Sequence, residues 1–356
     1  MKIRYRLVDL HSSKHFTNSS FRQLITLLLF LLFFAQGCSP STQLAKIPTE
    51  TSTQETILTL TTTLTPTSEP TLISALSPSP EATKFPAPEP TITPLPKPLV
   101  FAAIGDYGGG NSSEADVAYL IQSWQPEFII TLGDNNYPNG AANNMDNAIG
   151  QFFHNYIYPY QGTSGEGSDI NRFFPSLGNH DVKTDNGQPY FDFFTLPGNE
   201  RYYDFIWGPV HLFALDDLDS EPDGVGTSSI QADWLKERLA ASSSPWNIVY
   251  MHYPPYSSGT HGSMDWARWP YAEWGADAVL AGHDHTYERL WVDGTPYFVN
   301  GAGGYTLYNF VNILESSQVR YNADYGAMRM EATDGYLLFQ FYNRSNELID
   351  QLELKK

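Results

Sequence analysis

Side chains that can bind metal ions recur in five short blocks, and each block follows an apolar stretch that predicts a β-strand. The blocks are, in chain order, Gly105-Asp106-Tyr107-Gly108, Gly133-Asp134-Asn135-Asn136-Tyr137, Gly178-Asn179-His180-Asp181, Met251-His252-Tyr253-Pro254 and Gly282-His283-Asp284-His285. Carboxylate, amide, phenol and imidazole groups are the oxygen and nitrogen donors that iron, zinc and manganese accept. Because an open α/β sheet presents its ligand groups beyond the carboxyl ends of its strands, we expect these side chains to meet at one edge. Together they are sufficient for two adjacent metal ions.

Each block taken alone also has a purely structural explanation. Asp106 or Asp134 could cap the following helix, as aspartate often does. Tyr137 could be a buried tyrosine in an aromatic-rich loop, and His252 could be a structural residue at a strand end. However, five of the seven histidines beyond residue 38 lie in these blocks or follow one closely. Scattered surface positions do not explain that concentration, so the pattern favours a metal site.

The order and content of the blocks resemble the metallophosphoesterase superfamily over roughly residues 99–345. Many members have Asp-x-His in the first block, whereas Gly108 occupies the histidine position here. Tyr137 stands three residues after Asp134 and supplies an oxygen donor instead, as in the purple acid phosphatases. The segment from Gly282 to Arg289 is also similar to the last block of that family, including its Tyr-Glu-Arg end. The resemblance is to the small, tartrate-resistant-acid-phosphatase-like form, because no fibronectin-like domain precedes the blocks.

This resemblance implies a dinuclear centre that contains Fe(III) and a divalent ion, which would be iron, zinc or manganese. In the family, the aspartate of the second block bridges both ions, and that position is Asp134 here. The ligands implied for the iron are Asp106, Asp134, Tyr137 and His285, and those for the second ion are Asp134, Asn179, His252 and His283.

The resemblance also implies hydrolysis of phosphate monoesters at mildly acidic pH, in which a metal-bound hydroxide attacks phosphorus in line with the leaving oxygen. His180 is the candidate general acid for the leaving group. His261 is a candidate for steadying the phosphate or sharing that proton, or it is simply an exposed loop histidine. Two alternatives remain open: a phosphodiesterase or nucleotidase with the same metals, and a catalytically inactive, metal-stabilised surface-binding protein.

Apolar periodicity and turn signals predict an α/β fold, since the first half alternates strands with helices and the second half is rich in strands. The resemblance implies a four-layer αββα sandwich, in which two mixed β-sheets are flanked by helices. Strands are predicted over 99–104, 127–132, 173–177, 247–251 and 278–281; helices over 112–124, 144–156 and 229–241; and hairpins turning at 207–208, 293–294 and 334–335.

Three regions differ sharply in composition. Residues 1–38 contain a basic stretch, an apolar run too short to span a bilayer and the single cysteine, Cys38, which indicates an export signal of the secreted or lipoprotein type. Residues 39–98 contain 34 Ser, Thr or Pro among 60 residues, which predicts a disordered tether. Residues 99–356 are predicted to form the catalytic domain. The chain is therefore expected to be exported, and to contact a membrane only through its N-terminal segment.

Charge excludes one class of partner. Residues 39–356 contain 15 of the 20 basic and 38 of the 39 acidic residues, a net charge of −23. Such a chain does not bind nucleic acid through a basic surface. Small phosphorylated molecules are the expected substrates, and local metal charge must attract their phosphate groups.

Overall fold

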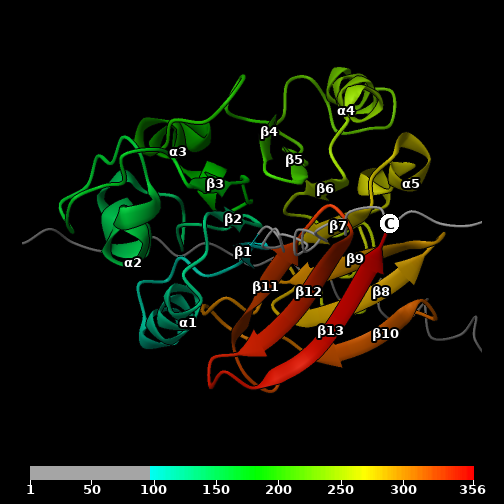
Figure 1. Ribbon diagram of the computed structural model, residues 1–356. Helices are drawn as coiled ribbons and strands as arrows, with labels where there is room; N and C mark the ends of the chain where they lie inside the picture. The colour runs from blue at the N-terminus through cyan, green and yellow to red at the C-terminus, as the bar shows by residue number, and fades with distance from the viewer. Residues whose placement is uncertain (1–96) are drawn as a thin grey trace, which may run out of the picture. The chain divides into compact units, whose positions relative to one another are not determined.

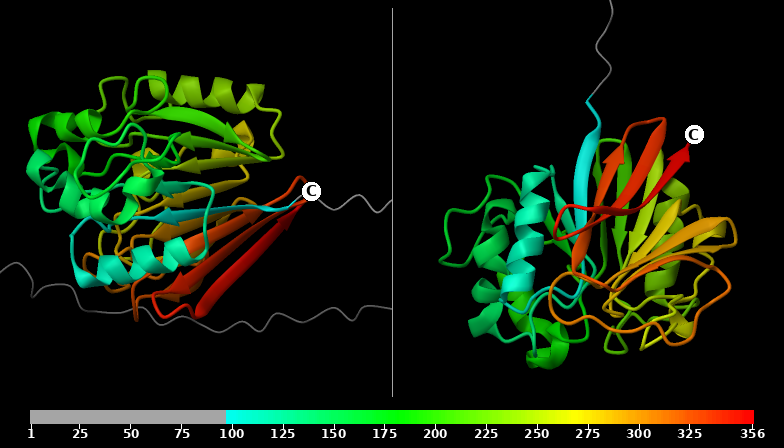
Figure 2. Two further views of the ribbon diagram at one scale, coloured as in Figure 1. Left: turned by 60° about the vertical axis from the view of Figure 1, so that its left-hand side comes forward. Right: turned by 90° about the horizontal axis from the view of Figure 1, so that it is seen from below.

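The computed structural model describes residues 97–356, and the predictions made for residues 1–38 and for most of 39–98 lie outside this range. The described part of the chain contains two β-sheets that face each other, with helices on the outer side of both (Figure 1 and Figure 2). The predicted fold class, an αββα sandwich with two mixed sheets, is confirmed.

The first sheet has the strand order β13-β12-β11-β1-β2-β3. Its parallel part consists of β1, β2 and β3, and its antiparallel part begins where β1 pairs with β11. The strand bounds are β1 Leu99–Ile104, β2 Ile129–Thr131, β3 Phe173–Pro175, β11 Gly326–Ala332, β12 Tyr336–Asn343 and β13 Leu348–Lys355.

The second sheet has the strand order β10-β8-β9-β7-β6-β5-β4. Strands β5, β6 and β7 are parallel to one another, and β9 continues this parallel set beside β7. The strand bounds are β4 Tyr203–Trp207, β5 Val210–Ala214, β6 Trp246–Tyr250, β7 Ala278–Ala281, β8 Tyr287–Val292, β9 Thr295–Asn300 and β10 Ser317–Tyr321.

Aromatic side chains fill the space between the sheets. Phe298 of β9 stacks on Phe339 of β12 with ring centroids 4.7 Å apart, and Tyr287 of β8 stacks on Phe341 of β12 at 4.0 Å. These contacts join strands of different sheets, and all four side chains are at most 1% exposed. Offset stacking of this kind adds to the stabilisation that burial of the rings provides.

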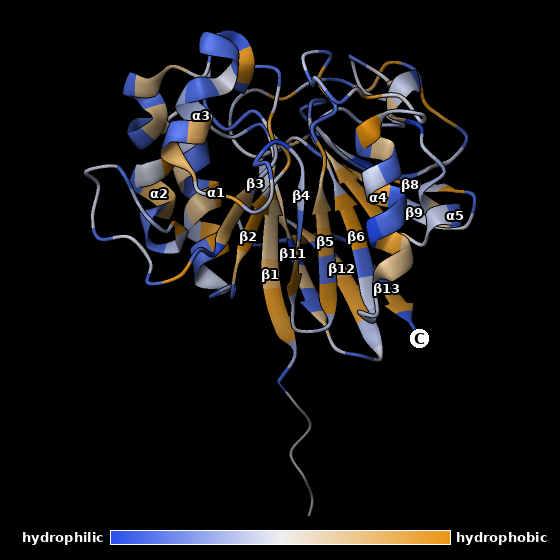
Figure 3. Cartoon of the chain, turned by 90° about the horizontal axis from the view of Figure 1, so that it is seen from above, coloured by the Kyte–Doolittle hydropathy of each residue, from blue (hydrophilic) through white to orange (hydrophobic). Residues whose placement is uncertain are grey.

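The helices form the two outer layers. Figure 3 shows α1, α2 and α3 on one side of the strands and α4 and α5 on the other. The bounds are α1 Ser112–Ser123, α2 Gln151–Phe153, α3 Gln188–Phe193, α4 Ile230–Ala241 and α5 Tyr271–Trp274. Leu235 and Leu239 of α4 belong to the same buried cluster as Val249 of β6, so the apolar side of this helix packs on the second sheet. Among residues 97–356, no helix has both the length and the apolar character that a membrane span requires.

Asn111 caps α1, because its side-chain oxygen accepts hydrogen bonds from the backbone of Ser113 and Glu114 at 2.8 and 3.0 Å. One local prediction needs correction. The single helix predicted over 144–156 is a series of short helical turns that includes the three-residue α2. In this segment the Asp146 carboxylate accepts hydrogen bonds from residues 163 and 164. The Asp146 carboxylate therefore ties this segment to the loop that contains Thr163 and Ser164.

Candidate metal centre

The five predicted blocks all lie at the carboxyl ends of strands. Asp106 follows β1, Asp134 follows β2, Asn179 follows β3, His252 follows β6 and His283 follows β7. β1, β2 and β3 are mutually parallel, as are β6 and β7, so each sheet presents its blocks at a single edge. In Figure 3, loops gather at the end of the sandwich opposite to the start of β1.

Four candidate ligands form one tight cluster. The Tyr137 hydroxyl lies 2.8 Å from Asp134 Oδ2, 3.2 Å from Asp106 Oδ1 and 3.0 Å from His285 Nε2. His285 Nε2 lies 3.2 Å from Asp106 Oδ1, and all four side chains are buried. Ligands bonded to one ion at about 2.0–2.2 Å are themselves separated by about 3 Å in an octahedral arrangement. The cluster therefore has the donor types and spacing that fit a metal ion, and Asp106, Asp134 and His285 stand out geometrically as such a group.

A second, looser group surrounds the other oxygen of Asp134. Asp134 Oδ1 lies 3.5 Å from His252 Nε2, which in turn lies 3.0 Å from Asn179 Oδ1. The ring of His283 is beside that of His252, with centroids 5.0 Å apart. The structure thus brings together all seven side chains predicted as ligands, four in one cluster and three around the far side of Asp134.

Backbone conformation and close packing hold the ligand loops in place. Asp106, Asp134 and His283 have φ values of 55°, 52° and 69°, in the left-handed region that side chains other than glycine adopt at a cost. The residue before Asp134 must be glycine, because a Cβ on Gly133 would lie 2.5 Å from His252 Nδ1. Strained backbone that the surroundings enforce is typical of functional sites.

Hydrogen bonds fix which nitrogen of each histidine faces the site. His252 Nδ1 lies 2.8 Å from the Leu132 carbonyl, and His285 Nδ1 lies 2.6 Å from the Thr306 carbonyl. Because a carbonyl only accepts, each Nδ1 carries the hydrogen, and each Nε2 is directed at the carboxylates. This is the usual arrangement of metal-binding histidines.

The electrostatics of the site also suit a cation. Burial acts to lower the pKa of His252, but the carboxylates of Asp134 and Asp106 outweigh it and raise the pKa to about 9. Burial raises the pKa of Tyr137, and the same two carboxylates raise it further. Asp106 and Asp134 therefore favour the protonated forms of His252 and Tyr137. A bound cation would instead favour the forms that have lost this proton.

The two predicted catalytic histidines lie beside the candidate ligands, His180 next to Tyr137 and His261 next to His283. The ring of His180 lies 4.4 Å from that of Tyr137, and its Nδ1 lies 2.6 Å from the Pro138 carbonyl. Burial lowers the pKa of His180, Asp134 opposes this effect, and Lys183 adds to it. His261 is exposed and stacks on His283 with ring centroids 4.3 Å apart.

Acidic residues within the blocks have structural roles that the sequence did not assign. Asp181 does not contact the His180 ring but accepts hydrogen bonds from the backbone of Asn135, Asn136 and Gly178, so it ties two ligand loops together.

Asp284 holds the loop that carries His261. It accepts hydrogen bonds from the His261 and Gly262 backbone at 2.8 and 3.0 Å and from the Ser257 hydroxyl at 2.6 Å. Glu288 accepts a further bond from the Ser258 backbone at 2.7 Å. Asp284 of the last block and Glu288 just after it therefore connect this part of the chain to the loop.

The two remaining histidines of residues 97–356 lie away from the centre. His211 Nε2 lies 2.7 Å from Asp204 Oδ2 in an ion-pair network with Arg238, and His154 bonds to the Glu166 carbonyl. Neither residue had a predicted role in the site.

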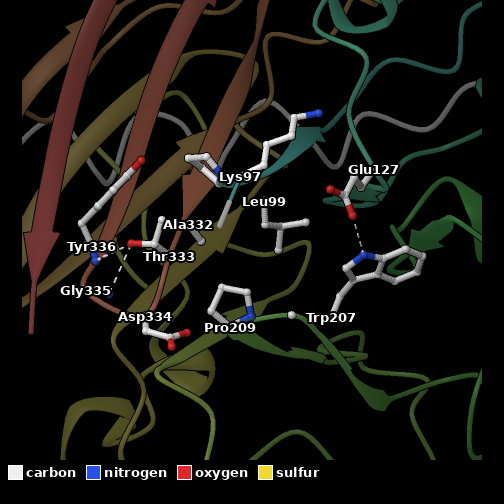
Figure 4. Close-up of a pocket in the computed structure, with 12 residues that line it drawn as sticks. Lys97, Leu99, Glu127, Trp207, Pro209, Ala332, Thr333, Asp334, Gly335 and Tyr336 are labelled. Atoms are coloured by element: carbon white, nitrogen blue, oxygen red, sulfur yellow. Dashed lines mark hydrogen bonds between the residues drawn. The ribbon is translucent and has the colours of Figure 1, made fainter. Parts of the chain in front are cut away.

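A cavity of about 810 Å³ lies elsewhere in the fold (Figure 4). It is lined by Leu99, Trp207, Pro209 and the turn between β11 and β12, and Trp207 donates a hydrogen bond to Glu127 at 3.0 Å. Leu99, which lines the cavity, begins β1, and Asp106 follows the end of the same strand. A strand rises about 3.3 Å per residue, so the cavity and the metal centre are about 20 Å apart. None of the predicted ligands lines this cavity.

Comparison with known proteins identifies the family. The model of the calcineurin-like phosphoesterases matches residues 99–287, which is over half of the chain. The chain belongs to this family, and the predicted enzyme class, a phosphatase-type hydrolase, is confirmed.

Comparison with individual proteins shows which members of this family the chain resembles. Tartrate-resistant acid phosphatase type 5 of Mus musculus is 26% identical over 238 residues, covering 58% of this chain and 73% of that protein. Fe(3+)-Zn(2+) purple acid phosphatase 12 of Arabidopsis thaliana is 25% identical over 212 residues, covering 53% and 43%. The structure of a purple acid phosphatase from Lupinus luteus superposes with a TM-score of 0.59 and 17% identity, covering 72% of this chain and about half, 54%, of that one. The predicted similarity to purple acid phosphatases is confirmed.

Proposed function

We propose that this chain is an acid phosphatase that hydrolyses phosphate monoesters with two metal ions. The observation that carries the proposal is the buried cluster of Asp106, Asp134, Tyr137 and His285, in which the contacting donor atoms lie 2.8–3.2 Å apart. Similarity to proteins named acid phosphatases supports the same reaction.

The first ion would be Fe(III), because an anionic phenolate oxygen is a favourable donor for a hard trivalent ion. The second would be a divalent iron, zinc or manganese ion held by Asn179, His252 and His283. A dinuclear pair supplies Lewis-acid charge for the phosphate and lowers the pKa of water so that hydroxide is available below neutral pH.

Asp134 is suited to join the two metal sites. One carboxylate oxygen faces Tyr137, and the other faces His252 and accepts the His180 backbone hydrogen bond at 2.8 Å. Each oxygen of the Asp134 carboxylate therefore lies beside a different group of candidate ligands. Removal of this one side chain would affect both groups at once.

His180 would give a proton to the leaving group. Its Nδ1 hydrogen is bonded to the Pro138 carbonyl, so Nε2 is the nitrogen that remains for proton transfer. The Lys183 ammonium donates to this Nε2 at 2.9 Å, so Nε2 would carry the transferred proton only after Lys183 turns toward the phosphate of a bound ester. His261, whose backbone Asp284 fixes, would contact the phosphate from the side of His283.

The substrates would be small phosphorylated molecules, and the chain would act outside the cell. The net charge of −23 over residues 39–356 disfavours binding of nucleic acid through a basic surface. Export would depend on residues 1–38, with Cys38 as a lipidation site or as part of a plain signal, and residues 39–98 would tether the enzyme. Membrane contact would be confined to this N-terminal segment.

Metal analysis combined with hydrolysis assays tests the proposal. The purified chain should contain two metal ions and release phosphate from an aryl monoester faster at pH 5–6 than at pH 8. Faster hydrolysis of a diester or a nucleotide than of any simple monoester would indicate the phosphodiesterase or nucleotidase alternative. A metal-loaded chain that hydrolyses none of these esters would instead support the inactive binding protein.

A further inference from the structure

Two tyrosines that the sequence pattern did not single out cover two of the candidate ligands. Tyr305 stacks flat on Tyr137, with ring centroids 3.6 Å apart and an interplanar angle of 2°. Tyr308 stacks on His285 at 4.0 Å and 7°. Both tyrosines belong to the loop that follows β9, so a single short segment contacts both aromatic members of the four-residue cluster.

The backbone of this loop is bonded to the ligand loops on both sides. Gly303 and Tyr305 donate hydrogen bonds to the carbonyls of Gly105 and Asp106 at 3.0 and 3.2 Å. The Thr306 carbonyl accepts the His285 Nδ1 hydrogen at 2.6 Å, and Tyr308 donates to the His285 carbonyl at 2.9 Å. The loop therefore connects the first ligand block to the last one.

Close approach of the loop requires glycine. A Cβ on Gly303 would lie 2.2 Å from the Gly105 carbonyl oxygen, which would push the loop away from the first ligand block. With glycine, the backbones meet and the two tyrosine rings reach Tyr137 and His285.

Burial indicates what Tyr305 does there. Tyr137 and His285 are each only 3% exposed, whereas Tyr305 is 37% exposed. Tyr305 thus lies between the Tyr137 ring and solvent. Removal of its ring would admit water to one face of Tyr137 and would let that ring rotate, whereas the exposed position of Tyr305 means that the core would remain intact.

We propose that Tyr305 and Tyr308 are positioning residues that hold the Tyr137 phenol and the His285 imidazole in the orientation that binds the metal ion. The inference rests on the proposed function, because it takes Tyr137 and His285 to be ligands. In this proposal the tyrosines orient the two ligands and do not bind the ion themselves. Groups that orient metal ligands typically change metal affinity by about 10–100-fold when they are removed.

The test replaces the stacking ring and then restores it. Tyr305→Leu and Tyr308→Leu remove the flat stacks, while Tyr305→Phe and Tyr308→Phe retain them without the hydroxyl groups. Tyr119→Leu is the matched control, since Tyr119 is 65% exposed on α1 and belongs to no ligand loop. The purified full chain is loaded with Fe(III) and Zn(II), and the rate of metal loss to excess EDTA is measured together with the visible spectrum. Circular dichroism and the melting temperature verify the fold of each variant.

Both leucine variants should lose the metal at least about 10-fold faster than the wild type, and Tyr305→Leu should also shift the visible band. The phenylalanine variants and Tyr119→Leu should behave like the wild type. Folded leucine variants with wild-type metal loss and spectrum would overturn the positioning role while leaving the phosphatase proposal intact. A wild type that retains no metal would contradict both proposals.

Discussion

The substitution His180→Ala separates proton donation from metal binding. Asp134 Oδ1 accepts a hydrogen bond from the backbone N–H of His180 at 2.8 Å, and not from the His180 side chain. An alanine retains that backbone hydrogen bond. The variant should therefore bind the same amount of metal and bind inorganic phosphate as the wild type does.

The loss of turnover should depend on the leaving group. A positioned general acid contributes about 10²–10⁴-fold, which corresponds to about 2.7–5.4 kcal/mol in the activation barrier. An alkyl phosphate needs the full contribution, because an alkoxide is a poor leaving group. Nitrophenyl phosphate needs little of it, because nitrophenolate leaves as a stable anion.

The assay measures kcat for both substrates between pH 4 and pH 8, with metal content determined on the same samples. His154→Ala is the control, since His154 bonds to the Glu166 carbonyl outside the site. Equal slowing of the two substrates, or loss of a metal ion, would refute the role of His180 as the leaving-group acid. The role would then pass to His261.

Three further predictions concern the metal bridge, a distant ion pair and the N-terminus. Asp134→Ala should remove both ions and nearly all activity, and retention of two ions would contradict the bridging role. Burial acts to raise the pKa of Asp204, but hydrogen bonds from His211 and Arg238 lower it overall. The stability that the ionised Asp204 gives to the fold is therefore present at neutral pH and is lost as the pH falls below about 4. Asp204→Asn should lower the free energy of unfolding, measured with urea, by about 1–2 kcal/mol at pH 7 and by less at pH 3. An equal loss at the two pH values would contradict the stabilising role of the Asp204 charge. Cys38→Ser should move the chain from the membrane to the soluble fraction, and unchanged partitioning would exclude lipidation.

The parts of the fold that the sequence predicted well are those buried on both faces. The strands β1 and β7 occur at their predicted bounds, Leu99–Ile104 and Ala278–Ala281, because continuous apolar runs are what a covered parallel sheet requires. β10 and β13 were not predicted. Both are edge strands in which few side chains are buried. β13 nevertheless has alternating apolar residues at Leu352 and Leu354, so the sequence contained a signal for this strand that was missed.

The candidate site likewise has parts that the sequence predicts and parts that it does not. Its ligand-type side chains could be read from short blocks, since each block follows a predictable strand. Tyr305, Tyr308 and Lys183 could not be found in this way. The tyrosines belong to a loop without periodicity, and their positions depend on how the two sheets bring β1 and β7 together. Lys183 is one exposed lysine of ordinary type, and only the three-dimensional structure places it beside His180.

The central claim is that Tyr137 and three neighbouring side chains bind Fe(III) as half of a dinuclear centre. Metal analysis of the purified chain together with its visible absorption spectrum tests this most directly. We expect two metal ions per chain, at least one of them iron, and a pink to violet colour from phenolate-to-iron charge transfer that Tyr137→Phe abolishes without unfolding the protein. An iron-loaded wild type that is colourless, or a Tyr137→Phe variant that retains the colour, would contradict the assignment.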